Sequence, residues 1–491
     1  MEGIFVEKKE KTFLGQPRGL STLFMTEFWE RFSYYGMKAI LLFYMYYAVE
    51  KGGLGFNQVT AASIMAIYGS LVYLAGVIGG FIADRLLGSR RTVFMGGVLI
   101  MFGHIALALP FGASALYVSI VLIVLGTGLL KPNISEMVGT LYSPEDVRRD
   151  TGFSIFVLGI NLGSLLAPAI VGTVGQKVNF HLGFSIAAIG MFFGLLQYYF
   201  GGRKYLSESS LHPTDPITPE ERPKVIRNIV LIVAAFVVVF GGLAIAGSLN
   251  IGMIVNVFSA IGVALPIFYF ILMLSSKKTT KVERSRIWAY IPLFFASVLF
   301  WSIEEQGSVI LALFAANQTQ LNLGWIELLP SWFQMLNPFF IIVYTPIFAI
   351  IWTKLGKRQP STPAKFATGL IFAGLSYVLM VLPTTLNGQK LSNAMWLVLS
   401  WAIVIIAEML ISPIGLSATT KLAPKAFQSQ MMSMWFLGDA MAQAINAQVV
   451  KLYSVHSAAM YFGVYGAIVV AFGVILFVGV PRIRNLMQGI K

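Results

Sequence analysis

The sequence predicts an all-α membrane protein of about fourteen transmembrane helices. Of its 491 residues, 57% are hydrophobic and only 11% are charged, and the mean hydropathy is +0.77. An ordinary soluble domain has about 25% charged residues, so a water-soluble fold is excluded. Apolar stretches of bilayer-spanning length, for example 113–130, 229–245 and 460–480, recur from end to end.

The basic net charge is explained by membrane topology. The formal net charge is +14, and most of the 35 Lys and Arg residues fall in loops on the side of the N-terminus. Such an asymmetry is the positive-inside rule, and it places both termini in the cytoplasm. No basic and aromatic pattern remains that would indicate nucleic acid, and the basic loops instead suit the anionic surface of a lipid bilayer.

Cysteine and histidine usage narrows the chemistry further. The chain has no cysteine and four histidines without a paired spacing. Disulfides and thiol chemistry are therefore ruled out, and we expect no metal or other cofactor. The charged segment 7–11 precedes the first apolar span, so we expect a cytoplasmic start and no cleavable signal peptide.

The spans group as six, two and six along the chain. Residues 1–19 form a polar tail and 20–200 a first six-helix bundle. Residues 201–286 comprise a proline-rich cytoplasmic linker and a helical hairpin, and 287–491 hold a second six-helix bundle. Two six-span halves around a midplane site are how many secondary carriers are built.

The first span carries a polar stripe. Charged side chains inside spans cost roughly 2.5–3.5 kcal/mol each on insertion scales, so they persist where they pair or line a polar path. Helical spacing puts most of this set on one face. A self-neutralised structural cluster is the alternative to a cavity wall. The stripe consists of Glu27, Glu30, Arg31, Tyr34, Tyr35 and Lys38.

Other spans add ionisable and polar residues. Lys131 follows a long uncharged run and precedes a proline, although it could also snorkel to the inner surface. Glu304 and Glu305 are adjacent, and we expect only one of them to face a pocket. The remaining candidates in the second half are Trp301, Asn337, Glu408, Ser412, Trp435 and Asp439.

The two halves contribute opposite charges. Cations come from the first half and carboxylates that lack a local partner come from the second, an arrangement that suits a zwitterionic substrate. Burial favours the neutral form of a carboxylate, so such a group can take up a proton near neutral pH. The pattern therefore favours a carrier that couples transport to a proton gradient.

Several motifs resemble one transporter family. The segment EFWERFSYYG at 27–36 matches the ExxERFxYYG motif of the proton-dependent oligopeptide transporter family, within the major facilitator superfamily. Similar agreement is seen for GFIADRLLGSRR at 80–91, GLLKPN at 128–133 and FVLGINLGSL at 156–165. The segments WSIEEQ at 301–306 and EMLISP at 408–413 continue it, so that the resemblance covers essentially the whole chain.

The resemblance implies a bacterial-type symporter of protons with di- and tripeptides, functional as a monomer in the cell membrane. It implies proton coupling through Glu27, Glu30, Arg31 and Glu305. It also implies gating ion pairs of Lys38 with Glu305 and of Lys131 with Glu408. The implied substrate-binding residues are Arg31, Tyr34, Tyr35, Lys38, Tyr73, Lys131, Asn161, Trp301, Asn337, Glu408, Ser412 and Trp435.

Two departures from the family pattern have consequences. Lys38 stands where arginine is common, which removes a bidentate fork for carboxylate. The second span, 63–84, has no histidine, so proton coupling must rest on carboxylates.

Two other functions remain as alternatives. The first is a member of the same family that carries another substrate, such as nitrate or a peptide-like metabolite. The second is an intramembrane enzyme, which the absence of a nucleophile spaced with a base disfavours.

Overall fold

The computed structural model describes residues 12–143, 146–386 and 390–490, and over these ranges the chain is almost entirely helical. Twelve helices in the described ranges are long and apolar enough to cross a membrane. Two further helices, α1 (Gly19–Tyr46) and α16 (Gln428–Val449), pack among them and contain the polar residues of the first and eleventh predicted core spans. The predicted all-α membrane fold with about fourteen spanning helices is confirmed.

The first half of the chain forms six spans that pack on one another. Helix α1 packs against α5 and α7, while α4 packs against α2 and α3. Proline and π-helical turns lengthen the second and fifth spans. After α1, these helices are α2 (Gln58–Ile82) with η2 (Ala83–Leu87), α3 (Ser89–Ala108), α4 (Gly112–Gly139), α5 (Arg149–Ala167) with η3 (Pro168–Gly172) and α6 (Thr173–Lys177), and α7 (Phe180–Tyr205).

A linker and a helical hairpin separate the halves. The linker contains η4 (Glu208–Leu211), and Arg85 of η2 pairs with its residues Asp215 and Glu221. The hairpin consists of α8 (Arg222–Ile245), which has no buried residue, and α9 (Ile251–Ser275). Helix α9 packs against both α2 and α16, so it contacts both halves of the molecule.

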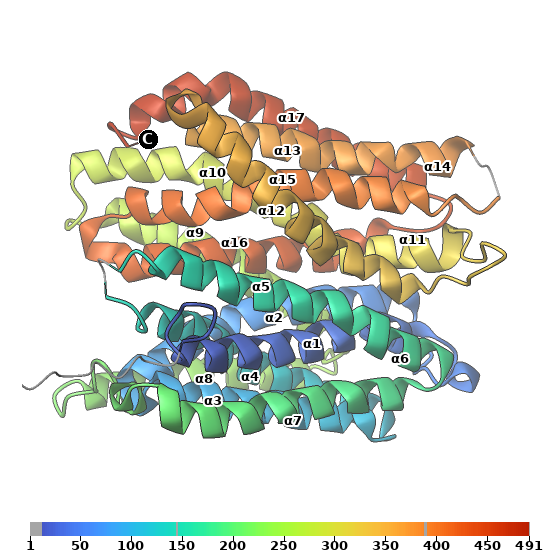
Figure 1. Ribbon diagram of the computed structural model, residues 1–491, viewed down its shortest axis with the longest axis horizontal. Helices are drawn as coiled ribbons and strands as arrows, with labels where there is room; N and C mark the ends of the chain where they lie inside the picture. The colour runs from blue at the N-terminus through green and yellow to red at the C-terminus, as the bar shows by residue number, and fades with distance from the viewer. Residues whose placement is uncertain (1–11, 144–145, 387–389, 491) are drawn as a thin grey trace, which may run out of the picture.

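The second half repeats the six-span plan, with a break in its first span. That break is η5, and it separates α10 from the short helix α11. The helices are α10 (Lys281–Glu305), η5 (Gln306–Ser308), α11 (Ile310–Gln318), η6 (Pro330–Met335) with α12 (Leu336–Leu355), η7 (Gly356–Arg358), α13 (Thr362–Leu379) with α14 (Val381–Leu386), α15 (Met395–Leu422), α16 with η9 (Val450–Leu452), and α17 (Ala458–Leu486). Figure 1 shows this half, in yellow to red, lying above the first half in blue and green.

The halves meet along two helix pairs, α2 with α16 and α5 with α12. Ser70 Oγ on α2 donates a hydrogen bond of 2.8 Å to the carbonyl of Ala440 on α16. Within the first half, a Cβ at Gly163 would lie 2.4 Å from the carbonyl oxygen of Phe28. Only glycine allows α5 to approach α1 this closely, and this contact brings Asn161 next to the polar stripe of α1.

The two ends of the interface between the halves differ. We call the side on which α1 begins the inner side and the opposite side the outer side. On the outer side, Gln176 of α6 accepts a hydrogen bond of 2.6 Å from Ser331 Oγ of η6. Trp332 Nε1 donates one of 2.9 Å to Thr173 Oγ1. On the inner side, the described parts of α4 and α15 form no hydrogen bond with each other among those the structure records, so the hydrogen bonds that join these ends of the two halves lie on the outer side.

Candidate functional site

A cavity of about 660 Å³ lies between the two halves. The first half contributes α1, α2, α4 and α5, and the second half contributes α10, α12 and α15. It continues toward the inner side along α12, where it is lined by Phe348, Ala349 and Trp352. Twelve of the predicted site residues line it: Glu27, Arg31, Tyr35, Lys38, Tyr73, Lys131, Asn161, Trp301, Glu305, Asn337, Glu408 and Ser412.

The charges of α1 form a compact buried cluster. Arg31 Nε lies 3.1 Å from Glu27 Oε1 and is also paired with Glu30. Its guanidinium carbon lies 5.3 Å from the ring centroid of Tyr34 and 6.0 Å from that of Tyr35. Two carboxylates therefore share one arginine, and Arg31 Nη2 and Glu27 Oε2 have no hydrogen-bond partner in the described protein. Glu30 Oε1 also lacks a partner, so the cluster is only partly self-neutralised and three of its polar atoms stay unpaired.

An ion pair joins the halves toward the outer side of the cavity. Lys38 Nζ lies 2.8 Å from Glu305 Oε2, and both side chains are about one-tenth exposed. This is the contact between a first-span cation and Glu305 that the resemblance implied. Because it joins α1 to α10, it holds the two halves together toward the outer side.

Both adjacent glutamates of α10 line the cavity, so the expectation that only one of them would face it is wrong. Glu305 reaches Lys38, whereas Glu304 Oε1 accepts a hydrogen bond of 2.6 Å from Asn337 Nδ2 on α12. Successive helical side chains diverge by about 100°, and the cavity extends around that much of α10 because α1 and α12 lie on different sides of the helix.

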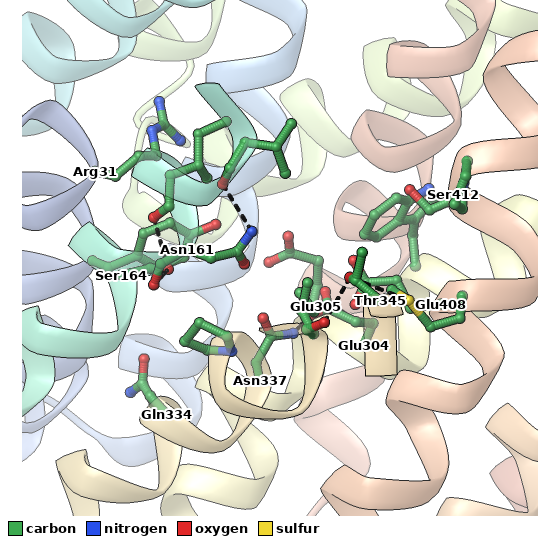
Figure 2. Close-up of a pocket in the computed structure, with 18 of the residues that line it drawn as sticks. Arg31, Asn161, Ser164, Glu304, Glu305, Gln334, Asn337, Thr345, Glu408 and Ser412 are labelled. Atoms are coloured by element: carbon green, nitrogen blue, oxygen red, sulfur yellow. Dashed lines mark hydrogen bonds between the residues drawn. The ribbon is translucent and has the colours of Figure 1, made fainter. Parts of the chain in front are cut away.

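The second implied ion pair is not formed in this conformation. Lys131 Nζ lies 3.5 Å from Tyr73 OH and 4.5 Å from the centroid of the Tyr73 ring. Across the cavity, Glu408 Oε2 is buried and has no hydrogen-bond partner in the described protein. Figure 2 shows Glu408 and Ser412 on one wall of the cavity and Arg31 and Asn161 on the other. The inner side therefore presents a cation and a carboxylate that face a common cavity without pairing.

Three of the implied site residues lie outside the cavity lining, as does the further candidate Asp439, whose Oδ1 accepts a hydrogen bond of 2.9 Å from Gln443 Nε2. Glu30 and Tyr34 lie one position away from the lining face of α1, which is made by Glu27, Arg31, Tyr35 and Lys38. Glu30 is fully buried behind the cluster, and Tyr34 packs edge-on against Tyr35 and near Tyr68. Trp435 is buried over Gly415, where an added Cβ would lie 2.1 Å from its ring. These three side chains act on the cavity only through their neighbours.

The structure adds cavity residues that sequence reasoning did not single out. Ser164 lies one turn from Asn161 on α5, and Gln334, Thr345 and Trp401 come from the second half. The indole nitrogens of Trp301 and Trp401 and the amide nitrogen of Gln334 are buried and lack a partner in the described protein. Serine, threonine and tryptophan inside a span are common packing residues, so the sequence carries no signal that separates these from their neighbours.

The fold and the cavity define a class of protein. Two packed halves line a polar cavity at their interface, with charged residues from both halves facing it, and this is the architecture of a secondary transporter. The cavity has no cluster of metal-ligating side chains among the described residues. The chain is a membrane transporter and not an enzyme.

The chain belongs to the POT family, whose model matches residues 90–470. It is 52% identical to the uncharacterized transporter YclF of Bacillus subtilis, over 100% of this chain and 99% of the relative. It is 50% identical to a di-/tripeptide transporter of Lactococcus lactis subsp. cremoris, over 99% of each chain. The resemblance found in the motifs is confirmed.

Solved structures of the family match the whole fold. The crystal structure of a peptide transporter POT in complex with sulfate is 54% identical, with a TM-score of 0.95 over 98% of each chain. A POT family transporter in complex with a thioalcohol-conjugated peptide is 45% identical, with a TM-score of 0.92 over 96% of this chain and 98% of that one.

Proposed function

We propose that this protein imports di- and tripeptides together with protons, by alternating access of the central cavity to the two sides of the membrane. The observation that carries the proposal is the charge arrangement of the cavity. In the first half, Arg31 has a free Nη2 and Lys131 has only a 3.5 Å contact with Tyr73. Both face the cavity that Glu408 of the second half also lines, and Glu408 Oε2 has no hydrogen-bond partner in the described protein. The family membership and the names of the relatives support a peptide as substrate.

The first half binds the carboxylate of the peptide. Arg31 Nη2 has no partner in the described protein, and Lys131 has only the long contact with Tyr73. Lys38, which was also expected here, is occupied by Glu305 in this conformation. A charge-assisted hydrogen bond to a carboxylate is roughly twice as strong as a neutral one, so two such donors fix one end of the substrate.

The second half binds the amino end. Glu408 supplies a carboxylate oxygen without a partner, and Asn337 adds its amide oxygen, because its nitrogen already donates to Glu304. A volume of about 660 Å³ lies within the range of about 300–1,000 Å³ that small-molecule sites occupy, so a two- or three-residue peptide fits between the two ends.

Protons act on the carboxylates that are paired with the cations of α1. Protonation of Glu305 removes its charge and with it the attraction to Lys38, so the outer side can open. Glu27 and Glu30 share Arg31, and protonation of one of them leaves the arginine freer to bind the substrate carboxylate. No other cofactor takes part in this scheme.

The proton gradient is large enough to drive accumulation. One charge moved through 100 mV supplies roughly 2.3 kcal/mol. One pH unit supplies about 1.4 kcal/mol more. Symport of one proton therefore supports accumulation of the order of 10²-fold to 10³-fold.

The membrane setting completes the proposal. The relatives are bacterial and the basic loops lie on the inner side, so we place the protein in the bacterial cell membrane with both termini in the cytoplasm. The described chain encloses the whole cavity by itself, so a monomer suffices.

Uptake into proteoliposomes tests this function. With an inside-alkaline pH gradient, labelled dialanine should accumulate in vesicles that contain the wild-type protein. Replacement Glu305→Gln should abolish gradient-driven uptake and leave counterflow exchange, because glutamine keeps the shape of the side chain but cannot release a proton. The matched control is Glu327→Gln, which removes an exposed carboxylate on the outer side and should leave both activities unchanged.

Two results would contradict the proposal. If dialanine uptake is the same with and without the pH gradient, transport is not coupled to protons. Transport of an inorganic anion such as nitrate without transport of dialanine would favour the alternative substrate class.

A further inference from the structure

A second cavity lies far from the transport site, at the inner ends of α3 and α7. It has a volume of about 320 Å³. The two helices pack side by side at the edge of the molecule (Figure 1). Because it begins where α3 starts and α7 ends, this cavity lies at the level of the inner membrane surface. Its lining includes Arg90, Arg91 and Arg203, together with Phe94, Met95 and Tyr199.

The three arginines carry a charge that the described protein does not balance. None of them forms an ion pair in the described ranges, whereas nearby Arg85 pairs with two carboxylates of the linker. Arg90 Nε would lie 3.3 Å from a Cβ at Gly202, so its guanidinium packs directly over the end of α7. Three cations gathered beside one cavity repel one another unless an anion binds between them.

The aromatic lining holds one of these cations in place. The guanidinium carbon of Arg203 lies 4.1 Å from the centroid of the Tyr199 ring. Tyr198 OH donates a hydrogen bond of 3.2 Å to the carbonyl of Arg90, which ties the start of α3 to α7. A stacked guanidinium keeps its planar fork free for a phosphate, and it recognises such a group bidentately.

The cavity opens onto an apolar surface that faces the lipid. Met95 is 47% exposed, Phe192 is 49% exposed and Tyr199 is 39% exposed. Further along the same helices, Phe102 and Leu196 continue this surface. A ligand with an anionic head and a long apolar tail matches both parts, because the head meets the arginines while the tail lies along α3 and α7.

We propose that the cavity between α3 and α7 is a binding site for an anionic phospholipid of the inner leaflet. The phosphate binds Arg90, Arg91 and Arg203, and the acyl chains pack on the apolar surface defined by Met95, Phe192 and Tyr199. Basic pockets between transmembrane helices on the cytoplasmic side are a recurring solution for anionic head groups. This site is independent of the peptide cavity.

Native mass spectrometry of the purified protein tests the proposal, with dioleoyl phosphatidylglycerol and dioleoyl phosphatidylcholine as probes. Each surface arginine contributes roughly a 5-fold change in affinity for an anionic membrane lipid. The double variant Arg91→Gln and Arg203→Gln should therefore bind phosphatidylglycerol about 25-fold more weakly than the wild type. Both replaced side chains are exposed, so the fold should tolerate the change.

A charge-matched control separates this site from general surface attraction. Lys278→Gln combined with Lys357→Gln also removes two exposed cations, and it should leave phosphatidylglycerol binding unchanged. Equal loss in both double variants, or equal affinity in the wild type and the arginine variant, would overturn the proposal. Inorganic phosphate is a third probe in the same measurement. If it binds the wild type as tightly as phosphatidylglycerol does and is lost in the arginine variant, the ligand is a free anion and the assignment to a phospholipid fails.

Discussion

The outer and inner ends of the central cavity use the same kinds of residues in opposite ways. At the outer end, Lys38 and Glu305 form an ion pair of 2.8 Å that joins α1 to α10. Toward the inner end, Lys131 and Glu408 face the cavity without pairing. The charged groups at the outer end therefore pair with each other, whereas those toward the inner end remain available to bind a ligand.

This difference shows how a carrier can link substrate binding to closure. A buried charge without a partner is costly, and pairing it recovers part of that cost. In the proposed mechanism, a zwitterionic peptide between Lys131 and Glu408 satisfies both groups at once, and a proton on Glu305 releases Lys38. The peptide thus changes the stability of the contacts at the inner end, and the proton changes the stability of the contacts at the outer end.

The largest expected effect comes from locking the outer end. A Cβ at Gly172 of η3 would lie 3.0 Å from Ser331 Cβ of η6, so a separation of the two segments by less than about 1 Å brings the pair into the range of about 3.5–4.5 Å that disulfides need. The pair Gly172→Cys and Ser331→Cys should therefore cross-link on oxidation and stop uptake almost completely, with recovery after reduction. The chain has no cysteine of its own, so labelled dialanine uptake before and after oxidant reports on this bond alone.

Each single cysteine variant serves as the control and should keep its uptake in oxidant. If the oxidised double variant still transports dialanine, the outer contacts between α6 and η6 do not open during transport. The proposal that the outer end of the cavity opens in each cycle would then be wrong.

The next effect tests which wall binds the amino end of the substrate. Acetylation of the amino group removes the charge that Glu408 is proposed to bind, and a hydrogen bond to a charged group contributes about 1.5–3 kcal/mol. N-acetyl dialanine should therefore compete at least 10-fold more weakly than dialanine for the wild type. In the Glu408→Gln variant, the ratio of the inhibitory concentrations of the two peptides should fall to a few-fold. Competition against uptake of labelled dialanine measures this ratio. An unchanged difference would place the amino end elsewhere.

A smaller effect is expected at the opposite wall. The substrate carboxylate has two donors there, Arg31 and Lys131, so the loss of one is partly compensated. Lys131→Gln should weaken dialanine binding about 10-fold and should reduce the penalty for dialanine amide relative to dialanine. Isothermal titration with both ligands measures the two values. The proposed orientation is contradicted if the amide and the acid keep their wild-type ratio of affinities in this variant.

The sequence was most informative where polar residues have no structural reason to be in a membrane. The stripe of α1 could be expected from charge alone, whereas the pair of Lys38 with Glu305 could be expected only from the family motif. Tyr34 and Trp435 could not be placed, because aromatic residues pack equally well in the core and beside a cavity. The joint exposure of Glu304 and Glu305 depends on where α12 packs against α10, which the sequence does not encode locally.

The smallest expected effect concerns the linker, which docks on the inner side against η2 and α3 of the first half. Asp215 N–H donates to the carbonyl of Asp84 at 3.0 Å, and Ile217 N–H donates to that of Arg85 at 3.3 Å. Arg85→Gln should speed hydrogen exchange of these two amides by about 2- to 5-fold, because exposed ion pairs contribute little. The control Lys224→Gln lies in the next helix, forms no ion pair in the described ranges and should change neither rate.

The same contact has a defined pH dependence. Hydrogen bonds from the Thr218 N–H group, followed by the charge of Arg85, hold the pKa of Glu221 below its usual value. A lowered pKa means that the stabilisation is fully present above the usual value of about 4.3 and is lost as the pH falls through the lowered pKa. Exchange at Asp215 and Ile217, corrected for the intrinsic rate, should therefore be constant between pH 6 and 8 and should rise only below about pH 4. A change near neutral pH would show that a group other than Glu221 controls this contact and would contradict the assignment of the pH dependence to the pair of Glu221 with Arg85.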